Sequence, residues 1–163
     1  MISICLPVHN MAERNYFFKR AMDSIERQTF KDYEVVVTEE GGMAMNTNAA
    51  IKKAKGEIIK ILFLDDYLAH PEALQRIADN FKRGWLATGC IHSDRTRLFN
   101  PHFPFWMGGI RDGVNTIGSP SVIAFENNDP LLFDENLSWM LDCDLYLRLF
   151  ERYGEPAILN DIS

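Results

Sequence analysis

The sequence predicts a single α/β domain in which helices cover both faces of a mostly parallel sheet. Three short apolar segments, rich in β-branched residues, alternate with amphipathic helical segments through the first half of the chain. Such strands are buried on both faces, and their alternation with helices is typical of parallel sheets. The chain of 163 residues has the length of one such domain.

Hydrophobic spacing places the individual elements. In the first half we expect strands at residues 2–8, 33–38 and 57–64, and helices at 13–28, 46–55 and from Pro71 onward. The second half is less regular, with strands expected at 85–91, 120–125 and 157–159 and a helix at 139–153. Residues 95–118 show no clear period but carry several aromatic side chains. A long segment without regular structure is typical of a functional or mobile loop.

Charge and composition limit the function classes. The formal net charge is −6, from 17 basic and 23 acidic residues, and no basic run interrupts the chain. An extended nucleic-acid partner normally needs a clustered basic face, so no nucleic acid is expected. A single nucleotide is compatible with this charge, because one bound cation can neutralise its phosphates.

The compartment is predicted to be the cytoplasm. The three cysteines are widely separated and form no CxxC pair, which argues against a disulfide framework or a zinc site. Met1 leads directly into an apolar strand without a basic leader, so no signal peptide is expected. The longest apolar stretch, residues 58–64, contains Lys60 and is far too short for a transmembrane segment. Peripheral membrane contact leaves no mark in the sequence and stays open.

Polar residues follow directly on the three apolar strands of the first half. They are Pro7, Val8, His9 and Asn10 after the first strand, Glu39 and Glu40 after the second, and Asp65 and Asp66 after the third. Ligands of open α/β sheets bind at the carboxyl ends of the parallel strands. We therefore expect these residues to share one rim of the sheet and to form a binding site there.

Asp65 and Asp66 are the sharpest candidates for a metal site. Two adjacent carboxylates repel each other unless a positive group lies nearby, and Mg²⁺ or Mn²⁺ prefers such oxygen ligands. The alternative is that the pair only caps the turn after the strand. The chain has no GxGxxG after its first strand and no GxxxxGK[ST], so a dinucleotide oxidoreductase or a P-loop enzyme is disfavoured.

Asp142 and Asp144 lie in the last predicted helix and point to nearly opposite sides of it. Asp142 shares the apolar face of the helix, where a carboxylate could serve as a general base. The alternative is that the helix dipole stabilises a carboxylate at the start of the helix and that Asp142 has no further role. Asp144 is placed to form an exposed i,i+4 ion pair with Arg148. The four histidines have no metal-binding spacing, and His9 is a candidate for contacting a base only through its strand-end position.

Four segments of the chain resemble the family 2 glycosyltransferases of the GT-A fold. They are ISICLPVHN, SIERQTFKDYEVVVTEEGG, NTNAAIKKAKGEIIKILFLDDYLAHPEAL and FDENLSWMLDCDLYLRL. These segments are similar, in order and spacing, to the PVYN opening of the family, its acidic strand end, its GExIxFLDxDD block and its late EDxDL helix. The resemblance covers most of the chain and implies a short, minimal member of the family with a Rossmann-like GT-A sheet.

The resemblance also implies roles for matching residues. Asp142 would be the general base, Asp66 would hold Mn²⁺ or Mg²⁺, and three aromatic residues would contact the acceptor. Those aromatic residues are Phe103, Phe105 and Trp106. Nucleotide contacts are implied for Pro7, Val8, His9, Asn10, Glu40, Asn48 and Asp65.

The implied activity is inverting transfer of a sugar from a nucleoside-diphosphate sugar, with a UDP-sugar favoured, to a hydroxyl of a glycan or related acceptor. Residues 1–94 would bind the donor, and residues 95–163 would carry the acceptor site and the base. An exposed aromatic loop would also suit a homodimer.

The chain departs from the family pattern in several places. Glu39 and Glu40 replace the usual Asp-Asp, Thr47 replaces an arginine, and Leu141 replaces the acidic neighbour of Asp142. A degenerate domain that binds nucleotide or glycan without turnover is therefore kept as an alternative. A sugar nucleotidyltransferase is a further alternative, which the missing Gly-rich basic loop disfavours.

Overall fold

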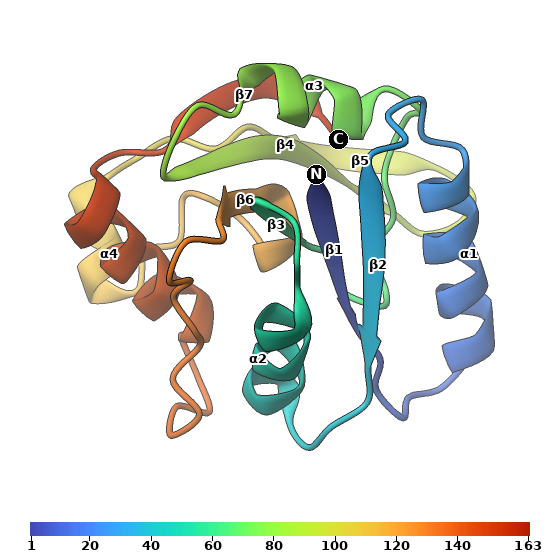
Figure 1. Cartoon of the computed structure of the whole chain (residues 1–163), viewed down its shortest axis with the longest axis horizontal. Helices are drawn as coiled ribbons and strands as arrows, with labels where there is room; N and C mark the ends of the chain where they lie inside the picture. Colours follow the sequence, from blue (N-terminus) through green and yellow to red (C-terminus); the bar gives the residue numbers. More distant parts are fainter.

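A seven-stranded sheet forms the centre of the computed structural model, which describes residues 1–163 (Figure 1). Its strands are β1 (Ile2–Pro7), β2 (Tyr33–Thr38), β3 (Ile58–Ile61), β4 (Trp85–Ser93), β5 (Leu98–His102), β6 (Ile123–Glu126) and β7 (Ala157–Ile162). The strand order is β2-β1-β3-β6-β4-β5, and β7 pairs with β4. Strands β2, β1 and β3 pair in parallel, as do β4 and β7, whereas β6 runs antiparallel between β3 and β4. The predicted mostly parallel sheet is confirmed.

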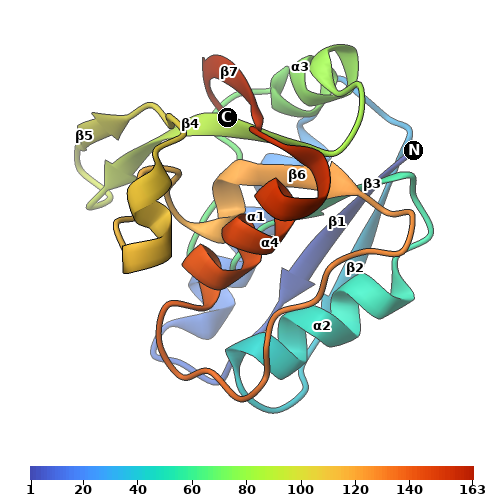
Figure 2. The same ribbon diagram turned by 90° about the vertical axis from the view of Figure 1, so that its left-hand side faces the viewer.

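Helices cover both faces of this sheet. They are α1 (Arg14–Glu26), α2 (Met43–Lys53), α3 (Ala73–Asn80) and α4 (Leu141–Tyr153), with short 3₁₀ helices η1 (Gly108–Asp112) and η2 (Pro120–Val122). Helices α2 and α4 lie in front of the strands in Figure 2, and α1 lies behind them. Two apolar cores result, one with α2 and α4 and the other with α1 and α3.

Strand β1 shows why the sequence pattern predicts this arrangement. Ile4 and Leu6 belong to the core beneath α1 and α3, whereas Cys5 between them belongs to the opposite core. Successive side chains of a strand point to opposite faces, so a strand between two helical layers must be apolar at nearly every position. Cys5 is fully buried, as expected of a core thiol, and burial raises its pKa to about 12.

The structure differs from the predicted elements mainly in the second half. Strand β5 lies inside the segment predicted to lack regular structure, and it pairs with the extended end of β4. The predicted strand at 120–125 begins as η2 and becomes β6 only at Ile123. Helix α4 begins at Leu141, two residues later than expected, because Met140 adopts a left-handed backbone conformation with φ of 59°.

The two predicted halves of the chain share one sheet. Strand β6, from the second half, lies between β3 and β4 of the first half, and β7 pairs with β4. The halves are therefore not separate folding units. None of the helices has the length and apolar character needed to cross a membrane.

Candidate active site

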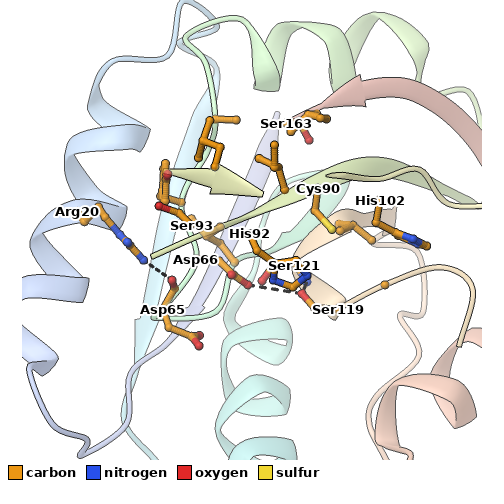
Figure 3. A pocket seen from close by; sticks show the side chains of 18 of the residues that line it. Arg20, Asp65, Asp66, Cys90, His92, Ser93, His102, Ser119, Ser121 and Ser163 are labelled. Carbon is orange, nitrogen blue, oxygen red and sulfur yellow. Dashed lines mark hydrogen bonds between the residues drawn. The ribbon is translucent and has the colours of Figure 1, made fainter. Parts of the chain in front are cut away.

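A cavity of about 660 Å³ opens at the carboxyl end of β3 (Figure 3). Its walls come from the turn after β3, from β4 and β5, from η2 and the loop before it, from the start of α4, from the end of β7 and from one residue of α1. The cavity has the size of a typical ligand pocket. Asp65, Asp66 and Asp142 all line it, so folding brings together three candidate residues from two distant parts of the chain.

The turn after β3 presents the two adjacent carboxylates. The backbone N–H of Asp66 donates to the Phe63 carbonyl (2.9 Å), which closes the turn. Asp65 is exposed, whereas Asp66 is half-buried and accepts a long hydrogen bond from the Ser119 hydroxyl (3.5 Å). Burial raises the pKa of the Asp66 carboxyl above its usual value, and the charge of Asp65 acts in the same direction. A cation bound beside these carboxylates would offset both effects.

A buried lysine lies behind this turn. Lys60 on β3 has no exposed surface, and its ammonium group donates to the Ser121 carbonyl. The Ser121 hydroxyl accepts from the backbone N–H of Phe63 (2.9 Å), so η2 is tied to the end of β3. Burial lowers the pKa of Lys60 to about 8, and the nearby Asp66 carboxylate opposes that shift.

The carboxylate of Asp142 is held in place by two hydrogen bonds. Its Oδ2 accepts from Nδ2 of Asn115 (2.6 Å), and its Oδ1 accepts from the backbone N–H of Cys143 (2.9 Å). Asp142 lies in the first turn of α4 and faces the cavity, as its position among apolar helix residues predicts. Asp144 instead pairs with Arg148, as expected (3.0 Å from Oδ2 to Nε).

Asn115 was not singled out from the sequence, yet it organises the loop beside Asp142. Its Oδ1 accepts from the backbone N–H groups of Ile117 and Gly118, both at 2.9 Å, and its Nδ2 also donates to the Gly118 carbonyl (2.9 Å). The buried Tyr146 hydroxyl donates to that same carbonyl (3.0 Å). Burial raises the pKa of Tyr146 well above its usual value, so it remains a neutral donor. No local motif surrounds Asn115 that could have signalled this role.

The predicted base-contacting residues lie at the ends of β1 and β2, two of which are joined by Asn46 of α2. The Asn46 side chain donates to the Val8 carbonyl (2.8 Å) and accepts from the backbone N–H of Glu40 (2.9 Å), which links the ends of β1 and β2. Pro7 and Val8 are buried, His9 is half-buried and Asn10 is exposed. Glu40 is exposed and pairs with Lys53 (2.7 Å). None of these residues lines the cavity that holds Asp65, Asp66 and Asp142.

Asn48 lies apart from both groups. It is 1% exposed, and its Nδ2 donates to the Phe133 carbonyl and to Glu135, both at 2.9 Å. Its Oδ1 accepts from the backbone N–H of Phe133 (2.8 Å). The side-chain amide of Asn48 thus forms its hydrogen bonds with other residues of the chain. The nucleotide contact expected for Asn48 stays a prediction.

The three aromatic candidates for acceptor contact divide into two kinds. Phe103 and Phe105, just after β5, are 48% and 53% exposed. Trp106 is half-buried, because its ring stacks on Phe150 (4.4 Å between centroids) and meets the edge of Trp85 (5.9 Å). Only the two phenylalanines are thus largely open to a ligand.

The side-chain oxygens of Asp65 and Asp66 are suitable ligands for a hard divalent cation. Both side chains offer carboxylate oxygens, which Mg²⁺ and Mn²⁺ prefer. No group of three or more histidine, cysteine or acidic side chains is arranged to hold a metal by itself. The remaining ligands would have to be oxygens of a bound substrate or water.

The central sheet with helices on both faces has the GT-A-type fold of solved glycosyltransferase structures. Among solved structures the chain is similar to S. aureus TarS (residues 1–349) in complex with UDP, with a TM-score of 0.72 and 15% identity. It is also similar to the same protein in complex with UDP-GlcNAc (TM-score 0.67, 18% identity). A third similar structure is the mannosyltransferase PcManGT from Pyrobaculum calidifontis in complex with GDP-Man and Mn²⁺ (TM-score 0.65, 17% identity).

These similarities concern the fold. Each alignment covers 99% of this chain but only 60%, 58% and 55%, respectively, of the solved chains. No protein-family model matches the sequence, and no curated protein matches it either.

Proposed function

We propose that the chain is an inverting glycosyltransferase domain that moves a sugar from a nucleoside-diphosphate sugar to a hydroxyl of a glycan or related acceptor. The observation that carries the proposal is the cavity in which an oriented Asp142 lies together with Asp65 and Asp66. Structures with the same fold hold UDP, UDP-GlcNAc or GDP-Man with Mn²⁺, and two of the three contain a uridine nucleotide. A UDP-sugar is therefore the favoured donor.

In this proposal the first half of the chain binds the donor. Asp65 contacts the ribose, and Asp66 holds Mn²⁺ or Mg²⁺ at the diphosphate. The residues at the ends of β1 and β2, which are Pro7, Val8, His9, Asn10 and Glu40, contact the base. When bound, the cation supplies positive charge to the leaving diphosphate.

The second half carries the acceptor and the base. Asp142 accepts the proton of the acceptor hydroxyl while that oxygen forms a bond to the anomeric carbon and the bond from that carbon to the diphosphate breaks. Its two hydrogen bonds hold the carboxylate toward the cavity without closing it off. Phe103 and Phe105 offer exposed rings on which an acceptor sugar could stack.

A thermal-shift panel tests donor binding. UDP, GDP, dTDP and CMP are each added with and without Mn²⁺, because a ligand that binds only the folded state raises its stability. We expect a Mn²⁺-dependent shift with one diphosphate, and we expect Asp66→Ala to abolish that dependence. The absence of any shift in the wild type would contradict the proposal.

Transfer from the sugar nucleotide selected by that panel tests the base. Asp142→Asn should retain the nucleotide shift and lose transfer by about a hundredfold or more. Asp144→Asn is the matched control, since it removes the same charge from the same helix but lies in the pair with Arg148. Full transfer by Asp142→Asn would refute the base assignment, and binding without transfer by the wild type would instead support the degenerate domain.

A further inference from the structure

Arg20 is the only lysine or arginine that lines the cavity. It projects from α1 toward the turn after β3, as Figure 3 shows, and its Nη2 donates to the Asp65 carbonyl. The other walls of the cavity include three aspartates. Arg20 is therefore the one fixed positive charge in direct reach of a ligand in an otherwise acidic site.

Aromatic rings hold the Arg20 guanidinium in place. Its central carbon lies 4.5 Å from the ring centre of Tyr67, 5.1 Å from that of Phe17 and 5.6 Å from that of Tyr16. Stacking of this kind stabilises a guanidinium and restricts its movement. A ligand that binds Arg20 would thus lose little side-chain entropy.

The hydrogen-bonding capacity of Arg20 is mostly unused. A guanidinium has five N–H donors, and here one bond to a backbone carbonyl is formed. Its Nε is buried and has no partner. Six other arginines form ion pairs with carboxylates, namely Arg14, Arg76, Arg95, Arg97, Arg148 and Arg152. An arginine that is immobilised, partly buried and unpaired beside a cavity is expected to have a ligand as its partner.

We propose that Arg20 binds a phosphate group of a substrate in this cavity. The planar guanidinium matches the oxygens of a phosphate, and such charge-assisted hydrogen bonds are stronger than neutral ones. Two sources present this chemistry: the diphosphate of the donor, which rests on the proposed function, and a phosphate ester on the acceptor.

Binding measurements on the Arg20→Gln variant test the proposal. Isothermal titration uses UDP, GDP, uridine, guanosine and inorganic pyrophosphate with Mn²⁺, and then glycerol phosphate in the presence of the nucleotide that binds. We expect Arg20→Gln to weaken binding of a phosphate-bearing probe by about ten- to a hundredfold. Arg20→Lys should lie between this variant and the wild type, because it keeps the charge and loses the planar donors.

Two controls separate phosphate binding from general damage. Arg27→Gln removes the same charge from the end of the same helix, where Arg27 is exposed and bonded only to the Asp23 carbonyl (2.9 Å). It should leave every affinity unchanged. Binding of the free nucleoside reports on the turn at Asp65, so an unchanged nucleoside affinity in Arg20→Gln shows that the turn is intact.

The outcomes distinguish a donor diphosphate from an acceptor phosphate as the ligand of Arg20. They also separate the Arg20 proposal from the proposed function. A loss confined to the nucleoside diphosphate or pyrophosphate supports Arg20 as a donor contact, and a loss confined to glycerol phosphate supports it as an acceptor contact. Unchanged affinities for all phosphate probes that the wild type binds would overturn the Arg20 proposal and leave the proposed function standing. If the wild type bound pyrophosphate through Arg20 but no nucleotide, the proposed function alone would fail, and if it bound no phosphate probe at all, both would fail.

Discussion

Lys60 is the most unusual single side chain of this protein, because a lysine without exposed surface is rare in a central strand. Its ammonium has one carbonyl partner and lies near the charge of Asp66. A buried charge of this kind costs stability, but below its pKa it also supplies a positive neighbour for the carboxylate proposed to bind metal.

The pH dependence of stability should reveal the charge of Lys60. Its pKa of about 8 lies below the value of 10.5 in the unfolded chain, so the folded state binds fewer protons between these values and stability rises with pH. Between pH 7 and 9 Lys60 should contribute an increase on the order of 1 kcal/mol to the free energy of unfolding, which is measured as the change in the difference between the wild type and Lys60→Met. Denaturant titrations of the wild type and of Lys60→Met across this range check the prediction.

The variant should lose the rise but keep the fall in stability expected at higher pH. Burial raises the pKa of Cys5 to about 12 and that of Cys143 to about 11, so the unfolded chain releases these protons first. That effect lowers stability in both proteins as the pH approaches 9 and rises beyond it. A rise between pH 7 and 9 that persisted in Lys60→Met would show that another group causes it.

Asn115 is expected to position Asp142 for transfer. Asn115→Ala removes the 2.6 Å hydrogen bond to the carboxylate, so kcat should fall by about tenfold while the KM for the donor stays unchanged. Steady-state kinetics of transfer measures both, and Asn115→Ser, which keeps a donor, should recover part of the loss. Equal changes in kcat and donor affinity would instead indicate a general disturbance of the cavity.

Gly113, directly after η1, lies close to the side chain of Met140, directly before α4. Gly113 has φ of 82°, and a Cβ there would lie 2.7 Å from the terminal methyl group of Met140. Met140 is itself in the left-handed region and directly precedes α4, which carries Asp142 two residues later. Both positions therefore constrain how the helix enters the site.

Gly113→Ala should destabilise the protein by about 1 kcal/mol, mainly because the left-handed backbone conformation is strained for alanine, and the new Cβ must also displace the flexible end of Met140. Gly108→Ala, at the other end of η1, is the matched control, since no atom lies within 4 Å of its added Cβ. Thermal melts of both variants test the prediction, which equal melting temperatures would contradict.

Hydrogen bonds between α2 and the segment that precedes α4 hold the two halves of the chain together. Asn48 on α2 bonds to Phe133, 85 residues away, and so anchors the segment that leads into α4. This tie connects the half expected to bind the donor with the half that carries Asp142. It also explains why an asparagine occupies a position that is 1% exposed.

Asn48→Ala should lower the free energy of unfolding by about 3 kcal/mol, because it leaves buried backbone groups of Phe133 unpaired. Chemical denaturation measures this loss, with Asn136→Ala as the control, since the Asn136 side chain bonds only to nearby Asp134 (2.8 Å). If Asn48→Ala were as stable as the wild type but failed to bind nucleotide, the direct contact predicted from the sequence would be supported instead.

Local patterns in the sequence were sufficient to predict the helices, the parallel strands and the inward face of α4. A strand between two helical layers is apolar throughout, and an amphipathic helix repeats its apolar residues every three or four positions, so both can be recognised from neighbouring residues. Asp65, Asp66 and Asp142 followed from the same logic, because each is a carboxylate next to apolar residues that predict burial. Strand β5 was missed because its LFNPH sequence gains its structure from pairing with β4.

Which side chains meet was decided only by the tertiary structure. Arg20 reaches the Asp65 carbonyl across 45 residues, Asn115 reaches Asp142 across 27, and Lys60 reaches Ser121 across 61. The Lys60 contact, for example, depends on the order of strands in the sheet, because η2 leads into β6, which pairs with β3. The spacing of residues along the chain reveals which elements form and which of their faces are apolar. It does not reveal the partner of a given side chain, because that partner is determined by packing between elements that are far apart in sequence.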